Sequence, residues 1–253
     1  MVVATRQSES ILSSGRILDE DKITRALNNA QNLGAEYAEI RLVSETTNTA
    51  SLKDGKLERA IPGQEVGVTM RILADGAWGV HSTSDIDSII DQVEPTYRLA
   101  KAVAARRSPS QPAVGLAEVP VIEDELHWRS VKDVRDTSLD TRIELMLAID
   151  NEAKDHEKIV STSTGWSDEH IHTELMTTEG MNRVWSFQRS LINGMVTARE
   201  GDDVVSYRMR HGGEGGLEVI ESCDLGEMGI NARVSALRLL GAERAPSGRI
   251  PLV

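Results

Sequence analysis

Aromatic residues and cysteine are scarce in this sequence. Its 253 residues include four Trp, three Tyr, one Phe and a single cysteine, Cys223. One cysteine excludes an internal disulfide. Lys and Arg number 28 against 40 Asp and Glu, which gives a formal charge of −12. Nucleic-acid backbones bind clustered positive charge, and single strands also stack on aromatic rings, so this composition predicts no nucleic-acid partner.

Long apolar runs are also missing. No stretch approaches the ~18 apolar residues that a membrane-spanning helix needs, and the first thirty residues lack the apolar core of a signal peptide. The sequence therefore predicts a cytoplasmic protein with no membrane partner. Apolar residues make up 40% of the chain, enough for a substantial core, and the length is typical of one large or two small domains.

The first half reads as a helix, an antiparallel meander and further helices. Apolar residues at helical spacing predict a helix over 20–33, with Asp19 as its N-cap. Alternation then predicts about five short strands between 37 and 83, with hairpin turns at Asp54-Gly55 and Asp75-Gly76. We expect a helix after Ser84, a break at Pro95 and a second helix to about 106.

The second half repeats this order. Ser138 is expected to cap a helix that follows it. Four strand candidates occupy 158–213 with a turn at Gly201-Asp202, and a final helix begins near 225. We expect the final helix to bury one apolar stripe, formed by Ile230, Val234, Leu237 and Leu240.

These patterns predict the α+β class, with two successive helix–antiparallel meander–helix units. The expected boundaries are a first domain at 1–107, a linker at 108–120, a second domain at 121–242 and, at 243–253, the start of a truncated C-terminal domain.

No complete catalytic constellation is present in the sequence. His170 and His172 would share one face of a strand with Glu174, but two imidazoles without a defined third ligand favour a solvated strand face. His156 and His211 are interpreted as exposed, because neither belongs to a ligand-spaced pair.

Three further features are interpreted as structural. Cys223 has no neighbouring His and is expected to be an inert, partly buried thiol. Trp78 lies between two glycines after a turn, where core packing is favoured over a cleft wall. The run HGGEGG lacks the lysine and spacing of a phosphate-binding loop, so a flexible loop is the preferred interpretation.

Specific segments resemble the TldD/PmbA family of zinc metallopeptidases. In order, these are GAEYAEIRLV, LKDGKLERA, GVTMRILADGAWGVHSTSD and, at the end, LRLLGAERAPSGRIPLV. The strongest match is the DGAWG segment, whereas residues 118–222 match mainly in strand pattern. The similarity is to the N-terminal region of the family.

The resemblance implies a peptidase whose metal is held by an HExxxH-type helix and a distant cysteine, all downstream of residue 253. No catalytic or metal residue can be assigned in this chain, and its substrate-binding residues are unknown. The family also implies zinc in the intact protein, a dimer of like or unlike TldD/PmbA-type chains, and unfolded or short peptides as substrates.

Three hypotheses follow, and the chain's own enzymatic status stays open among them. The first is a non-catalytic scaffold that controls substrate access in a TldD/PmbA-like metallopeptidase. The alternative is a regulatory or binding subunit without peptidase activity that partners an active enzyme. A third is a free-standing metal enzyme that uses His170 and His172.

Overall fold

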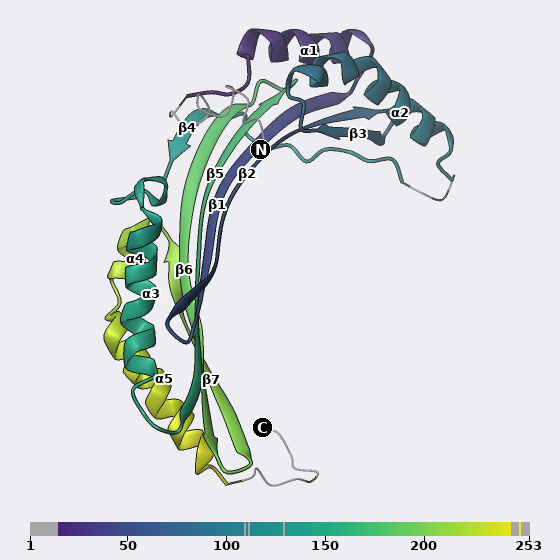
Figure 1. Cartoon of the computed structure of the whole chain (residues 1–253). Coiled ribbons are helices and arrows are strands. Elements are labelled where there is room, and N and C mark those ends of the chain that lie inside the picture. Colours follow the sequence, from purple (N-terminus) through teal and green to yellow (C-terminus); the bar gives the residue numbers. More distant parts are fainter. Residues whose placement is uncertain (1–14, 109, 111, 129, 244–247, 249–253) are drawn as a thin grey trace. The chain divides into compact units, whose positions relative to one another are not determined.

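The α+β class is confirmed by a computed structural model, which describes residues 15–108, 110, 112–128, 130–243 and 248. The described strands form one seven-stranded sheet in the order β3-β2-β1-β5-β6-β4, with β7 also paired to β6 (Figure 1). In the first half the elements are α1 (Glu20–Asn32), β1 (Tyr37–Lys53), β2 (Lys56–Ala74), β3 (Ala77–Thr83), the 3-10 helix η1 (Asp87–Gln92) and α2 (Val93–Ala105).

The second half repeats the helix–meander–helix order and adds an edge strand. Its elements are β4 (Glu123–His127), the 3-10 helix η2 (Val134–Asp136), α3 (Leu139–Ala153), β5 (Ile159–Thr177), β6 (Asn182–Glu200), β7 (Asp203–Glu214), α4 (Leu217–Glu221) and α5 (Leu225–Leu240). Strand β4 was not predicted, and it pairs in parallel with the start of β6. Its five residues are all exposed, so no burial pattern marked it in the sequence.

Contacts divide the chain into two compact units that interleave in the sequence. The first unit contains 1–46, 64–128 and 171–187, and the second contains 47–63, 129–170 and 188–253. Each unit has its own apolar core. The predicted boundaries at 107, 120 and 242 stay a prediction, and the expected further domain at 243–253 lies almost wholly outside the described residues.

The predicted hairpin turns are confirmed. Asp54 and Gly55 have φ values of 51° and 78°, and Asp75 and Gly76 have values of 49° and 66°. Positive φ at both central residues is the signature of the two-residue turn that matches the twist of paired strands. Strands β2 and β3 pair antiparallel around the second turn, with Ala74 opposite Ala77.

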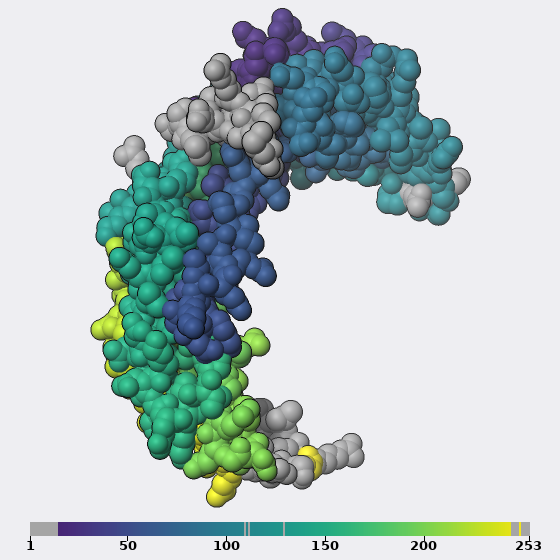
Figure 2. All heavy atoms as spheres, in the orientation of Figure 1, coloured from purple at the N-terminus to yellow at the C-terminus, as the bar shows by residue number. Residues whose placement is uncertain are grey.

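In place of the five short strands expected, the structure has two long strands, β1 and β2, and one short strand, β3. Residues 44–49, SETTNT, continue β1 because threonine is β-branched and fits an extended chain. Pro62 and Gly63 do not interrupt β2, since residues 56–62 form an exposed part of that strand, visible at the surface in Figure 2 (blue). In the same way β5 joins two predicted strands.

The core of the first unit lies between α1, η1, α2 and the strands β1 and β2. It contains Leu27, Ile40, Met70, Ile72 and Ile89, each at most 5% exposed. Asp19 caps α1 by accepting a hydrogen bond from the Lys22 amide, as predicted. The expected helix after Ser84 is the 3-10 helix η1, followed by α2.

The second unit packs α3, α4 and α5 on one face of its strands (Figure 1). Its core includes Met146, Trp166, Ile192 and Ile220. The predicted apolar stripe of α5 is only partly right. Leu237 and Leu240 pack against the core and Ile230 is exposed, while the buried positions are Leu225, Gly229, Ala232 and Ala236. Small residues bring α5 against α3: a Cβ on Gly229 would lie 2.4 Å from the Ile149 carbonyl oxygen.

Replacing Gly79 with alanine should lower the free energy of unfolding by about 1–3 kcal/mol. A Cβ at this buried position of β3 would lie 2.1 Å from the Thr96 carbonyl oxygen and 2.9 Å from the Ala100 amide nitrogen, both in the α2 backbone. Urea unfolding followed by circular dichroism measures the loss. The matched control is Gly115→Ala, because a Cβ there meets nothing within 4 Å. Equal stabilities of the two variants would contradict the close packing of α2 on β3.

Candidate functional site

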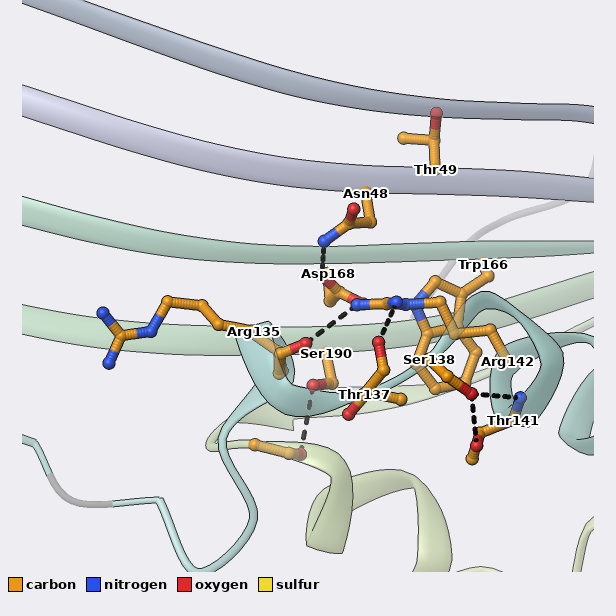
Figure 3. A network of polar contacts seen from close by, with 12 residues as sticks. Asn48, Thr49, Arg135, Thr137, Ser138, Thr141, Arg142, Trp166, Asp168 and Ser190 are labelled. Carbon is orange, nitrogen blue, oxygen red and sulfur yellow. Dashed lines mark hydrogen bonds and ion pairs between the residues drawn. The ribbon is translucent and has the colours of Figure 1, made fainter. Parts of the chain in front are cut away.

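A buried ion pair lies at the centre of the polar contacts of the second unit (Figure 3). Arg142 Nε of α3 donates to Asp168 Oδ2 of β5 at 2.7 Å, and the two side chains are 6% and 0% exposed. The Trp166 indole nitrogen donates to the same oxygen at 2.6 Å, and Asn48 Nδ2 donates to Asp168 Oδ1 at 2.9 Å. Every oxygen of this buried carboxylate therefore has a donor.

The same guanidinium fixes the chain that leads into α3. Arg142 Nη2 donates to the Val134 carbonyl at 2.8 Å, and Nη1 donates to the Thr137 carbonyl. The Val134 amide in turn donates to Gln188 Oε1 at 3.0 Å. All three nitrogens of the guanidinium are thus used by the fold, and this network is structural.

The predicted candidate pair on β5 is divided between the two units. His170 belongs to the second unit and His172 to the first. The His172 ring nitrogen Nε2 lies 2.9 Å from Glu174 Oε1. Glu174 is 1% exposed, and its two oxygens accept hydrogen bonds from the amides of Ile17 at 2.5 Å and Leu18 at 3.1 Å. Glu174 therefore holds the segment before α1.

The other predicted residues also have local structural roles. The His156 ring accepts the Lys158 amide at 3.1 Å after α3, and His211 Nε2 lies 2.8 Å from the Val219 carbonyl. Burial raises the pKa of the Cys223 thiol, and the nearby carboxylates of Asp224 and Glu227 raise it further. A thiol held protonated in this way is a poor nucleophile. Among the described residues, no three His, Cys, Asp or Glu side chains gather as a metal site requires.

Trp78 both packs and lines a hollow. Its ring is 5.8 Å from the Tyr37 ring, edge to face, and the Arg71 guanidinium lies 4.4 Å from its centroid. A hollow of about 620 Å³ beside it is also lined by Arg106 and Arg107 at the end of α2. Arg107 Nη1 is used by the fold, because it donates to the carbonyls of Asp75 and Gly76.

The HGGEGG run is not the flexible loop that we expected. Its first four residues end β7, and Gly216 crosses the chain before η2 so closely that a Cβ would lie 1.9 Å from the Lys132 carbonyl oxygen. Glu218 fixes this crossing by accepting the amides of Val131 at 3.1 Å, Lys132 at 2.9 Å and Gly216 at 3.0 Å. The glycines therefore serve a close backbone approach.

A second hollow, of about 320 Å³, lies on the sheet face of the second unit opposite α3 and α5. We call this the open face. Arg189, Leu191 and Arg210 line the hollow together with Glu169 and Glu214. Sequence analysis missed this cluster, although the alternation of Ser, Arg and Arg in SYRMRHG, at every second residue, is typical of one strand face.

Comparisons with known proteins agree on one family. The family model for PmbA/TldA metallopeptidase domain 1 matches residues 38–106, and the model for the central domain matches residues 132–240. A protein named metalloprotease from Methanothermobacter thermautotrophicus is 28% identical over 218 residues, which are 86% of this chain and 46% of that protein. The chain spans about half the length of the curated relatives it matches.

Solved structures share the fold at low sequence identity. A protein of Thermotoga maritima described as a modulator of DNA gyrase superposes with a TM-score of 0.69 at 18% identity, covering 90% of this chain and 50% of that one. TldE from Thermococcus kodakarensis gives a TM-score of 0.62 at 14% identity, covering 85% and 47%. In the described part of this chain, no helix has the length and apolar character to cross a membrane.

Breaking the buried ion pair should be costly. Arg142→Met leaves the buried Asp168 carboxylate without its ion-pair partner, so we expect the free energy of unfolding to fall by about 3–5 kcal/mol in urea titrations. The matched control is Arg98→Met, which removes an exposed pair with Glu94 and should cost at most about 1 kcal/mol. A loss of similar size in both variants would show that the buried pair does not hold α3 on the sheet.

Glu218 should make the second unit sensitive to acid. Partial burial raises the pKa of its carboxyl, but hydrogen bonds from the backbone amides of Lys132, Gly216 and Val131 outweigh this effect, so that the pKa is lowered. A lowered pKa means that the stabilisation is present above the unfolded value, about pH 4.3, and is lost as pH falls through the folded value.

The measurement is the free energy of unfolding as a function of pH. Glu218→Gln should be less stable than the wild type at neutral pH and should lose less stability than the wild type below about pH 4. Exposed Glu58 on β2 supplies the control, Glu58→Gln. A Glu218→Gln variant with the same pH slope as the wild type would refute this role.

Proposed function

Because the chain belongs to the PmbA/TldD family of metallopeptidases, we propose that it forms the non-catalytic scaffold and substrate-access part of such an enzyme. The proposal rests on the two family models that match this chain, which describe domain 1 and the central domain. Relatives named metalloprotease are about twice as long as this chain. We therefore place the metal, zinc by family resemblance, in the part of the enzyme outside residues 1–253.

The side chains of this chain support a scaffold role. The buried carboxylates Asp168 and Glu174 each accept several hydrogen bonds that hold elements together. Acids whose oxygens are occupied by backbone amides or a guanidinium in this way are fixed in place, which suits positioning rather than proton transfer. The chain's contribution to catalysis would then be to position and admit the substrate.

Unfolded or short peptides are the substrates that this role favours. A sheet wall that admits only extended chains gives selectivity by access rather than by readout of side chains. A strand edge can also pair with an extended peptide through backbone hydrogen bonds. Within the described sheet β7 pairs only with β6, so its second edge is free to pair with such a peptide.

Assembly with a second TldD/PmbA-type chain, like or unlike, belongs to the proposal. The likeness in fold to TldE supports it, since that protein has the same architecture. We place the assembly in the cytoplasm. In the alternative, this chain is a regulatory subunit, and the metal centre belongs to a separate active enzyme that it partners.

The proposal predicts peptidase activity only in the full assembly. Residues 1–253 alone should hydrolyse no unstructured peptide, whereas the complete product of the gene that encodes them should do so, with loss of activity when a chelator removes the metal. Peptide cleavage by mass spectrometry and metal content by elemental analysis measure both.

Two outcomes would contradict it. Hydrolysis by residues 1–253 with about one bound zinc per chain would show that the chain carries its own metal centre. Inactivity of the complete product until an active TldD/PmbA-type enzyme is added would instead support the regulatory alternative.

A further inference from the structure

The two sheet faces of the second unit differ sharply in chemistry. Met209 of β7 and Trp166 of β5 point into the core beneath α3 and α5. Neighbouring residues along a strand point to opposite faces, so Arg208 and Arg210 lie on the open face. Both arginines are exposed. This face therefore carries positive charge in a chain whose formal charge is −12.

The two arginines of β7 have uncharged neighbours across the ladder. Arg208 lies opposite Met195, and Arg210 lies opposite Asn193. Two residues apart on one strand, their Cα atoms are about 7 Å apart. No described residue accepts a hydrogen bond from either guanidinium or forms an ion pair with it. Two like charges this close repel each other, and an anionic ligand placed against both would offset that repulsion.

The hollow of about 320 Å³ adds the shape of a site to this charge. Arg189, on one side, is balanced by Glu169 at 3.1 Å and by Glu214 at 3.8 Å. Arg210, which lines the same hollow, has no such carboxylate. Thr197 of β6 lies on the open face, because its hydroxyl is 3.0 Å from the Oγ of Ser206, two residues before Arg208 on β7. Arg199 lies two residues beyond Thr197 and therefore shares this face. The surplus charge on this face is positive.

Strand β5, which β6 separates from β7, presents small side chains on the same face. Its open-face positions next to β6 are Ser163, Gly165 and Ser167, all small. A Cβ on Gly165 would lie 2.9 Å from Asn193 Oδ1, so the amide group of Asn193 reaches over the glycine. Hydroxyl and amide groups of this kind can hydrogen-bond the backbone of a chain laid on the face.

We propose that the open face of the second unit binds an extended, acidic polypeptide segment, whose carboxylates pair with Arg199, Arg208 and Arg210. Alternate residues of an extended peptide repeat at about 7 Å, which is the spacing of Arg208 and Arg210. Guanidinium groups bind carboxylates through two parallel hydrogen bonds. The inference rests on the proposed function and names the class of peptide that the access part receives.

A nucleic acid fits this face less well than a peptide. The open-face positions of β5, β6 and β7 in the second unit carry no aromatic side chain. Single strands are held by base stacking as well as by charge, and this face offers only the charge.

The test measures binding rather than hydrolysis. A fluorescein-labelled peptide of alternating Glu and Ser, and a matched peptide of alternating Lys and Ser, are titrated with the chain in fluorescence anisotropy. The Glu peptide should bind and the Lys peptide should not. Arg208→Gln/Arg210→Gln should weaken binding of the Glu peptide by about tenfold or more, and added salt should weaken wild-type binding more than binding by this variant.

A charge-matched control separates local from global effects. Arg25→Gln/Arg98→Gln removes the same charge from exposed positions of α1 and α2 and should change affinity by less than about twofold. Arg208→Lys/Arg210→Lys keeps the charge but loses the bidentate geometry, so its affinity should lie between the wild type and the glutamine variant. Circular dichroism checks that each variant is folded.

Several results would overturn the inference. These are equal binding of the two peptides, wild-type affinity in the glutamine variant, or displacement of the Glu peptide by a single-stranded oligonucleotide that binds more tightly. Self-association of the wild type that the glutamine variant abolishes, measured by light scattering, would make a second copy of the chain the occupant.

The outcome is separable from that of the proposed function. Peptide cleavage by the complete gene product, with no preference for the Glu peptide, would leave the proposed function standing and remove this inference. Binding of the Glu peptide at the arginines, in a complete product that cleaves nothing, would do the opposite.

Discussion

The buried pair of Arg142 and Asp168 is the contact on which the second unit depends. Removing two charges from water costs several kcal/mol per ion, and only full hydrogen bonding repays this cost. Here the carboxylate accepts hydrogen bonds from Trp166 and Asn48, and the guanidinium donates to two backbone carbonyls. Because each member is satisfied only in one arrangement, the pair fixes the helix register on the strands.

This constraint also decides which sheet face is left open. Asp168 must point toward α3, so its neighbours Ser167 and Glu169 point away from it. Residues paired across neighbouring strands share a face, so the same alternation places Arg208 and Arg210 on the open face. The buried Arg142 is therefore balanced by the Asp168 carboxylate, whereas Arg208 and Arg210 on the open face have no such partner among the described residues. The contrast between the faces is a consequence of the core.

Turns and helix caps could be predicted from the sequence, whereas side-chain pairs distant in sequence could not. Asp54-Gly55 and the N-caps Asp19 and Ser138 were predicted correctly, because a turn or a cap is decided by adjacent residues. The partners Arg142 and Asp168 are 26 residues apart, and no periodicity marks them. The same limit applies to α5, because its contact with α3 selects small residues such as Gly229 for the buried face.

The charge of −12, from which we expected no nucleic-acid partner, does not describe the charge of each face of the molecule. At physiological ionic strength the Debye length is about 8 Å, so a bound ligand interacts mainly with charges within roughly that distance. Around Arg208 and Arg210 those charges are positive, with Glu214 and Glu169 already paired to Arg189. Distant carboxylates lower the rate of encounter but contribute little once an acidic chain is in contact. Net charge therefore affects the association rate of such a ligand, whereas the arginines that alternate along β7 determine its affinity once it is in contact.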